Sequence, residues 1–341
     1  MTGKQRILMA LRGEQPDRTP VFPLAHYYTA RFRKITIRDF AADGEKMGAA
    51  LIAGFERFEW DGVNPGCDVA VEGEALGSLL DYPEQAPPSV MRPYLTDPEN
   101  IRFLRKPNPL REGRMPVVVR ATRMCARELG NQVFIGTWTM GPFNCASQVR
   151  GVEDLMTDTI ERPKFVENLL DFSTDVLLDY GKAIIDAGAD AIFLGEALCT
   201  PAMISPNFYR EVVVPRQVRL IKDLKQYGAS YVLLHICGDV KRILPAMIET
   251  GAGIFDLDWQ MDMGESRQTC AGKVTLRGNL DPAATLLQGS PDLVNEKSLE
   301  VIRAAASGGR LILGSGCDVA PATPPENIDA MMAAAKAALP H

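Results

Sequence analysis

The stretch Tyr231-Val-Leu-Leu-His-Ile-Cys-Gly238 is an apolar run that ends in a histidine, a cysteine and a glycine. Its composition predicts a buried β-strand. Because residues two apart on a strand point to the same side, His235 and Cys237 are expected to converge at the strand's end. The run Arg310-Leu-Ile-Leu-Gly-Ser-Gly-Cys-Asp318 repeats this design, with Cys317 after a glycine turn. The two runs raise the question of whether both strand ends meet around one metal ion.

Short apolar runs alternate with helical patterns over most of the 341-residue chain. The runs lie at 21–25, 60–68, 133–139, 191–194, 231–238, 254–258, 274–279 and 311–313. Helices are expected at 44–58, 117–129, 143–160, 163–187, 205–227, 240–250, 263–271, 291–306 and 326–338. Strands that are apolar on both faces and separated by helices predict a parallel sheet. Eight such units favour an α/β protein with a (β/α)8 barrel, and we expect residues 1–341 to form a single domain.

Two segments lie outside this alternation. Residues 2–12 precede the first strand and predict an N-terminal helical extension. Residues 69–113 follow the second strand, are rich in proline, glycine and acidic side chains, and show no clear periodicity. A long insertion of this kind usually carries function or forms a lid. Since the active site of a barrel lies at the C-terminal ends of its strands, we look for the site among the residues that follow each strand.

The composition limits the class of protein. Hydrophobic residues make up 46% and charged residues 23% of the chain, as in soluble globular proteins, and the net charge is −6. The acidic balance argues against nucleic-acid binding. No apolar run is long enough to span a membrane, and the N-terminus lacks a signal-peptide core. Seven scattered cysteines fit a reducing compartment, so we expect a cytoplasmic protein with neither nucleic-acid nor membrane partners.

Polar residues follow the predicted strands, and in a barrel they would face one pocket. They are His26, Asp68, Trp138, Thr139, Glu196, His235, Cys237, Asp258, Asn279, Asp281, Cys317 and Asp318. The terminal residue, His341, is expected to be disordered.

His235, Cys237 and Cys317 form a His-Cys-Cys set from the fifth and eighth strands. Three protein ligands that leave a fourth position open are typical of catalytic zinc. Glu196, at the end of the neighbouring fourth strand, is interpreted as a fourth ligand or as a nearby base. The alternative is a packing role for each residue, because a single cysteine is as often a small core residue as a ligand. The other cysteines lack such partners and are interpreted as structural, with Cys67 and Cys199 as weaker candidates: Cys67, Cys125, Cys145, Cys199 and Cys270.

Four separated segments resemble, in the right order, the uroporphyrinogen decarboxylase superfamily. They are Ile204-Ser-Pro-Asn-Phe-Tyr-Arg-Glu-Val-Val-Val-Pro215, His235-Ile-Cys-Gly238, Leu257-Asp-Trp259 and Arg277-Gly-Asn-Leu-Asp-Pro282. The resemblance runs from about residue 3 to residue 337 and implies a (β/α)8 barrel, in agreement with the strand count.

One branch of this superfamily is the decarboxylases, for which the resemblance implies no metal. They carry an arginine-rich motif after the first strand and Gly-His-Gly after the last. This chain instead has Leu24-Ala-His-Tyr-Tyr-Thr-Ala-Arg31 and Gly316-Cys-Asp318. Arg31 and Arg33 are the remaining candidates for binding the carboxylates of a tetrapyrrole. A metal-free decarboxylase is therefore the alternative function.

The other branch is the cobamide-dependent methyltransferases, including methylcobamide:coenzyme M methyltransferases. Their zinc motif is His-x-Cys, followed some eighty residues later by cysteine, and His235, Cys237 and Cys317 match it residue by residue. The resemblance implies zinc-dependent methyl transfer in one-carbon metabolism, between a corrinoid protein and a thiol or similar acceptor. In this hypothesis the catalytic candidates are Glu196, Asp258 and Asn279, and the substrate-binding candidates are His26, Trp138 and Asp318.

The cofactor itself is expected on a partner protein. No Asp-x-His-x-x-Gly corrinoid-ligand motif occurs in this chain, so a corrinoid protein would bring the methylcobamide. The 69–113 insertion is a candidate docking segment. The small-molecule acceptor or donor stays open between coenzyme M, tetrahydrofolate and a methoxylated compound. A non-catalytic relative that binds zinc or a corrinoid is a further alternative.

Overall fold

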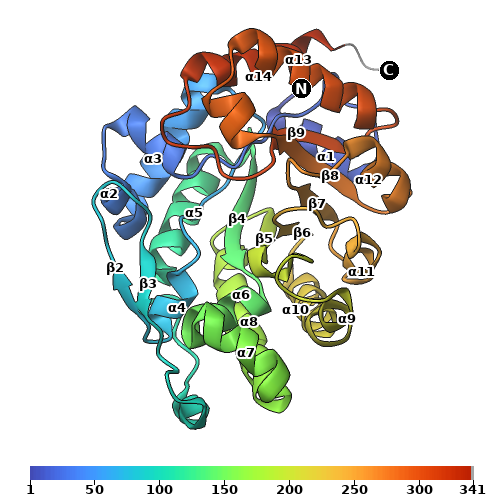
Figure 1. The fold of residues 1–341 in the computed structure, drawn as a ribbon. Coiled ribbons are helices and arrows are strands. Elements are labelled where there is room, and N and C mark those ends of the chain that lie inside the picture. The colour runs from blue at the N-terminus through green and yellow to red at the C-terminus, as the bar shows by residue number, and fades with distance from the viewer. Residues whose placement is uncertain (339–341) are drawn as a thin grey trace.

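The computed structural model describes residues 1–338 and shows a curled parallel sheet surrounded by helices (Figure 1). The sheet runs in the order β1 (Gly62–Val63), β4 (Phe134–Met140), β5 (Ala191–Gly195), β6 (Tyr231–Ile236), β7 (Ile254–Leu257), β8 (Thr275–Leu280) and β9 (Leu311–Ser315). Every pair of neighbours in this order is parallel. The predicted barrel-like α/β fold is confirmed. His341 lies outside the described residues.

The segment around Val21 occupies the eighth position of the barrel. Val21 forms an isolated parallel bridge with Leu313 of β9, and the Asp61 amide, beside β1, donates to the Val21 carbonyl oxygen at 2.7 Å. The predicted strand at 21–25 was wrong in extent, since only this bridge forms. Pro20 and Pro23 flank it, and a proline has no N–H group to donate to a sheet. In the segment 60–68, predicted as a strand and a loop, the strand is limited to the two residues of β1, ahead of Pro65.

Helices cover the outside of the barrel, close to the predicted ranges. They are α2 (Ile37–Ala42), α3 (Gly44–Phe58), α5 (Met115–Leu129), α6 (Pro142–Arg150), α7 (Val152–Glu161), α8 (Pro163–Asp186), α9 (Pro206–Phe208), α10 (Val214–Tyr227), α11 (Leu244–Glu249), α12 (Met263–Cys270), α13 (Pro291–Ala305) and α14 (Pro325–Ala337). The single helix expected at 143–160 is divided at Gly151, whose φ of 91° cannot continue a helix. Within residues 1–338, no helix is long and apolar enough to cross a membrane.

The N-terminal extension closes one end of the barrel. Helix α1 (Gly3–Arg12) begins with a capping box, in which the Thr2 side chain accepts a hydrogen bond from the Gln5 amide. Its buried residues Ile7, Ala10 and Leu11 pack with a cluster of strand residues that includes Phe22, Phe134, Phe193, Leu233 and Ile312. The interior at this end is therefore filled by side chains, which leaves the opposite end for a site.

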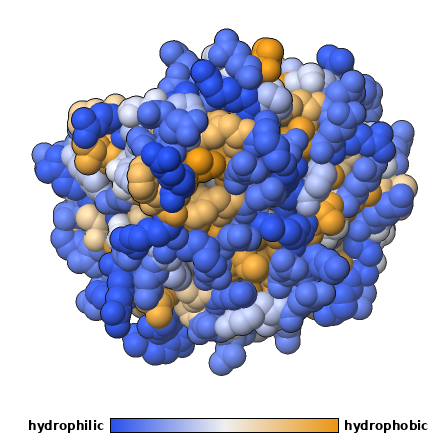
Figure 2. Space-filling view, turned by 90° about the horizontal axis from the view of Figure 1, so that it is seen from below, coloured by the Kyte–Doolittle hydropathy of each residue, from blue (hydrophilic) through white to orange (hydrophobic). Residues whose placement is uncertain are grey.

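The 69–113 insertion has more structure than its sequence indicated. It contains the short helix α4 (Val71–Ala75) and an antiparallel pair, β2 (Leu79–Asp81) and β3 (Ser89–Arg92), which lies outside the barrel sheet (Figure 1). Large exposed hydrophobic side chains are frequent along it: Val69, Leu79, Met91, Tyr94, Phe103 and Leu110. On the face seen from below in Figure 2, hydrophobic residues gather in the middle and hydrophilic residues form the rim. This face of the molecule therefore carries exposed hydrophobic surface.

Candidate metal centre

Three neighbouring strands bring charged residues to one level of the barrel. His235 on β6 is in register with Asp256 on β7, and Asp256 is in register with Arg277 on β8. On β6, Leu233 belongs to the interior cluster, and the two-residue repeat of a strand brings His235 to the same side. All three charged residues are buried. Parallel pairing thus places a histidine, a carboxylate and a guanidinium side by side inside the barrel.

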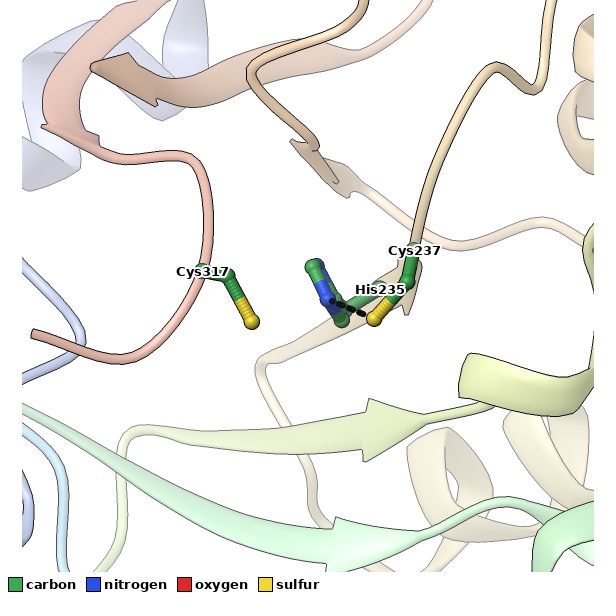
Figure 3. A group of neighbouring side chains, drawn as sticks. All are labelled: His235, Cys237 and Cys317. Atoms are coloured by element: carbon green, nitrogen blue, oxygen red, sulfur yellow. Dashed lines mark hydrogen bonds between the residues drawn. The ribbon is translucent and has the colours of Figure 1, made fainter. Parts of the chain in front are cut away.

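His235, Cys237 and Cys317 meet as the sequence predicted. Their potential ligand atoms all lie within 4.8 Å of one another, and His235 Nε2 lies 3.2 Å from Cys237 Sγ. In Figure 3 the two cysteine side chains point toward each other from the ends of different strands, with the His235 ring between them. Zinc forms bonds of about 2.0–2.3 Å to nitrogen and sulfur, which this spacing accommodates. The donor set of three residues fits a catalytic zinc site with one position open.

The two thiols are electrostatically different when no metal is bound. Hydrogen bonds from Cys317 and His235 lower the pKa of Cys237 to about 5, against the opposing effect of burial. The pKa of Cys317 rises, because its hydrogen bond to Cys237 and its burial both favour the protonated thiol. The lowered pKa of Cys237 favours its thiolate, which is the form that binds a metal.

Asp256 orients the His235 ring. The carboxylate oxygen Oδ2 of Asp256 lies 2.9 Å from His235 Nδ1, and the Asp256 backbone oxygen lies 3.1 Å from it. Burial lowers the pKa of His235, but hydrogen bonds to Asp256 and Cys237 outweigh it and raise this pKa well above its usual value. Arg277 Nη1 donates to the other Asp256 oxygen at 2.5 Å. With Nδ1 held by Asp256, Nε2 is the nitrogen that faces the cysteines.

A cavity of about 390 Å³ opens beside these ligands. Its lining comes from both barrel and insertion: Leu24, His26, Tyr27, Cys67, Asp68, Val69, Pro87, Pro88, Ser89, Trp138, Met140, Asn144, Gly195, Ala197, His235, Cys237, Cys317 and Asp318. This volume is in the range of small-molecule sites. The insertion therefore contributes wall residues, in keeping with the role expected of a long loop.

The three predicted substrate-binding residues all line this cavity. His26 Nδ1 lies 3.2 Å from Asp318 Oδ2, and His26 Nε2 lies 2.6 Å from the Asn64 side-chain nitrogen. The Trp138 ring centroid lies 5.7 Å from that of His26 and 5.8 Å from that of His235. Trp138 thus lies close to both imidazoles and adds an aromatic surface to the cavity wall.

Glu196 is not brought to the cavity or to the three ligand atoms. Its fully buried carboxylate accepts hydrogen bonds from the Asn144 amide at 2.9 Å and the Gln217 side chain at 3.2 Å. A Cβ atom on Gly141 would lie 2.3 Å from the Glu196 carboxyl carbon, so the side chain fills the space at the start of α6. Burial raises its pKa to about 7. In this arrangement Glu196 caps a helix and does not reach the metal ligands.

Asp258 and Asn279 lie behind the cavity wall and are not among its lining residues. The Asn279 side-chain nitrogen donates to the backbone oxygens of Asp258 at 3.0 Å and Met261 at 2.7 Å. Asp258 accepts a hydrogen bond from the Gln260 amide at 3.0 Å. The pair holds the loop that follows β7, beside the Cys237 loop.

Asp256 and Arg277 were missed as site residues from the sequence, because both lie within predicted strands and not after them. A signal was present, since a charged residue inside an apolar strand run needs a partner. Asp68, predicted to face the pocket, is also held by a partner that was not predicted, Arg114, whose Nη2 donates to it at 2.8 Å.

The model of the family described as uroporphyrinogen decarboxylase (URO-D) matches residues 2–338. The chain belongs to the URO-D family. Among the curated relatives of this URO-D chain, the methylated-thiol–coenzyme M methyltransferase of Methanosarcina mazei is 30% identical over 340 residues, covering 98% of this chain and 89% of that protein. The methylcobamide:CoM methyltransferase MtbA of Methanosarcina acetivorans is 28% identical over 341 residues, covering 98% of each.

A solved structure of a methyltransferase from Methanosarcina mazei superimposes on this URO-D chain with a TM-score of 0.90, 27% identity and 98% coverage of both chains. The resemblance to methylcobamide:coenzyme M methyltransferases is thereby confirmed, and those relatives are enzymes that transfer methyl groups. A uroporphyrinogen decarboxylase of Nostoc sp. is 26% identical over 335 residues, covering 94% of this chain and 93% of that protein. Membership of the URO-D family is therefore compatible with both the decarboxylase and the methyltransferase branch. The residues of the site distinguish the two branches.

Proposed function

We propose that the chain is a zinc-dependent methyltransferase, which moves a methyl group between methylcobamide on a corrinoid protein and a thiol or similar acceptor in the cytoplasm. The observation that carries this proposal is the meeting of His235, Cys237 and Cys317, with donor atoms within 4.8 Å of one another, beside a cavity of about 390 Å³. The seven cysteines are all free, as a reducing compartment would keep them.

The three residues would hold zinc through one imidazole nitrogen and two sulfurs, with Asp256 fixing the ring of His235. Bound zinc would lower the pKa of a substrate thiol and keep its thiolate in place. The residues His26, Trp138 and Asp318 are the proposed contacts of that substrate along the cavity wall. The protein's own contribution is thus to orient the thiol and to exclude water around it.

The transfer itself exchanges one bond for another. The acceptor thiol loses its proton to solvent, and its sulfur forms a bond to the methyl carbon while the cobalt–carbon bond breaks. The electron pair of the broken bond stays on cobalt, so methylcob(III)amide becomes cob(I)amide and the thiol becomes a methyl thioether. The reverse direction uses the same groups.

The corrinoid is proposed to approach from outside on its partner protein. A cavity of about 390 Å³ accommodates a small thiol but not a corrin ring. The insertion borders the cavity through Val69, Pro87, Pro88 and Ser89 and carries exposed hydrophobic side chains nearby. Exposed apolar surface beside an active site is typical of a docking surface.

The decarboxylase alternative is disfavoured by the lining of the cavity. A tetrapyrrole with several carboxylates requires arginines for charge-assisted hydrogen bonds. Neither remaining candidate lines the cavity: Arg31 donates to the Thr323 backbone oxygen at 2.7 Å, and Arg33 donates to the Ala49 backbone oxygen at 3.2 Å. Throughout the described chain, no lysine or arginine contributes to this cavity's wall.

The proposal is tested by metal analysis together with methyl transfer from free methylcobalamin to 2-mercaptoethanol. Wild-type protein is expected to contain zinc at near-unit stoichiometry and to demethylate methylcobalamin. Cys317→Ala should lose both, because two ligands cannot retain the ion. Cys270→Ala, which removes a buried thiol on α12 away from the cluster, is the matched control and should keep both. Zinc-free wild-type protein, or full zinc and activity in Cys317→Ala, would refute the mechanism.

A further inference from the structure

Apolar and aromatic side chains make up much of the cavity wall, together with the three metal ligands and the polar residues His26, Asp68, Ser89, Asn144 and Asp318. Its apolar and aromatic members are Leu24, Tyr27, Val69, Pro87, Pro88, Trp138 and Met140. Such a wall favours a substrate that buries carbon surface. The charged groups around it decide which polar groups that substrate can carry.

Two arginines, Arg114 and Arg277, bind carboxylates near the cavity, and both are buried behind its wall. Arg114 is 4% exposed, donates to Asp68 at 2.8 Å through Nη2 and to Glu74 at 2.7 Å through Nε. Arg277 is fully buried and binds Asp256 through Nη1, while its Nη2 atom is buried without a hydrogen-bond partner and does not line the cavity. Neither side chain lines the cavity, so neither is available to bind an anionic substrate group.

The charged side chains that line the cavity are carboxylates, and one of them is paired with an arginine. Asp318 lines it with one carboxylate oxygen near His26 and with the other, Oδ1, lacking a hydrogen-bond partner. The carboxylate of Asp68 is paired with Arg114. At the ligands, two thiolates and a neutral imidazole would balance a divalent ion, so the metal centre adds no net positive charge. An anion in the cavity would therefore meet a carboxylate and no counter-charge.

We infer that the small substrate of this cavity is a thiol with an uncharged, apolar body, and not one that carries a sulfonate, carboxylate or phosphate group. The inference rests on the proposed function and narrows its substrate class. Removing an anionic group from water without a cationic partner is strongly unfavourable, whereas an uncharged alkyl or aryl body gains from the wall. It also separates this chain from relatives named for coenzyme M, a thiol that carries a sulfonate.

The test is a series of thiols that share a two-carbon chain from the sulfur and differ in the group that follows. They are 1-propanethiol, 2-mercaptoethanol, 2-mercaptoethanesulfonate and 3-mercaptopropionate, each used with zinc-loaded protein and methylcobalamin. After subtraction of each uncatalysed rate, kcat/KM for the two uncharged thiols is expected to exceed that of the two anionic thiols by about tenfold or more. Calorimetric binding of the same thiols, without methylcobalamin, should give the same order of affinity.

A variant that adds a positively charged side chain to the cavity wall should remove the preference for uncharged thiols. Val69 lines the cavity and is 44% exposed, so a longer side chain at this position does not disturb the core. Val69→Arg is expected to raise kcat/KM for 2-mercaptoethanesulfonate by about tenfold relative to Val69→Gln, which has a long polar side chain without charge. The kcat/KM for 1-propanethiol should differ little between Val69→Arg and Val69→Gln.

The outcomes separate the two proposals. If the sulfonate is the best substrate of the wild-type protein, the inference is overturned and the methyltransferase function stands. If no thiol binds or accepts a methyl group, the proposed function fails, and the inference fails with it. Preference for uncharged thiols that disappears in Val69→Arg but not in Val69→Gln supports the inference.

Discussion

At the scale of single residues, Asp256 links the candidate metal ligand His235 to the barrel interior. One of its oxygens faces His235 Nδ1 at 2.9 Å, and the other binds Arg277 at 2.5 Å. The Arg277 guanidinium in turn lies 4.8 Å from the centroid of the Phe22 ring and donates to the Phe22 backbone oxygen at 2.9 Å. A buried carboxylate with this set of partners fixes both the position and the orientation of the histidine.

Asp256→Asn should weaken zinc binding by about 10–100-fold, because the ring of His235 loses the carboxylate that orients it. It should also destabilise the protein by roughly 3–5 kcal/mol, since Arg277 is left buried without its counter-ion. Chelator competition measures the first effect and urea denaturation the second. Asp239→Asn, which changes an exposed carboxylate after β6, is the control and should change neither. Equal zinc affinity in wild-type protein and Asp256→Asn would argue against an orienting role.

At the scale of elements, a buried ion-pair network around Arg114 helps to attach the insertion to the barrel. Arg114, just before α5, binds Asp68 and Glu74, and Glu74 accepts a hydrogen bond from Tyr82 at 2.6 Å. Tyr27, after the first strand segment, donates to Asp68 at 2.8 Å. The network therefore joins the two ends of the insertion, at Asp68 and Arg114, and links them to Tyr27 on the cavity wall.

Arg114→Ala should release the insertion from the barrel. Removing one partner of a buried ion pair costs roughly 3–5 kcal/mol, because Asp68 and Glu74 keep their charges without a counter-ion. Limited proteolysis is expected to cleave within 69–113 much faster than in the wild-type protein. Arg105→Ala is the matched control, since the Arg105–Glu112 pair is exposed and contributes at most about 1 kcal/mol. Similar cleavage rates in the two variants would contradict the anchoring role.

At the scale of the whole molecule, two buried carboxylic acids couple folding stability to pH. Burial raises the pKa of Glu72 and of Glu196 to about 7, from 4.5. Between these values the folded protein holds a proton that the unfolded chain releases. Stability from these groups is therefore present below about pH 4.5 and is lost as pH rises to about 7, by about 3 kcal/mol for each group.

Glu196→Gln should remove one of these contributions. Relative to wild-type protein, the free energy of unfolding of the variant is expected to rise by up to about 3 kcal/mol between about pH 5 and about pH 8, because glutamine does not ionise. Urea denaturation across this range measures the difference. Glu153→Gln, at an exposed position on α7, should follow the wild-type curve. A Glu196→Gln curve parallel to that of the wild-type protein would show that Glu196 does not titrate in this window. Activity measured in the same variant tests whether Glu196 has the catalytic role predicted from the sequence.

The order of strands and helices could be predicted from the chain because each unit has a local cause. Apolar runs such as 191–194 and 231–236 are short, and each is bounded by a helical pattern, so their type follows from their length, composition and flanking segments. The failures are also local in origin. Pro20, Pro23 and Pro65 shorten the first two strands. The hairpin of the insertion has two short and mostly exposed strands, which lack the alternation of apolar and polar residues that a periodicity test detects.

The sequence by itself determined the repeated βα alternation and the three residues His235, Cys237 and Cys317, because strand periodicity and ligand chemistry are properties of single segments. Only the tertiary structure decided which polar residues share a site with them. Barrel closure and strand register brought Asp256 and Arg277 into line with His235, placed His26, Trp138 and Asp318 on the cavity wall, and turned Glu196 toward the start of α6. These relations join residues that are distant in the chain, and they depend on which strands pair and on which side chains fill the space between them.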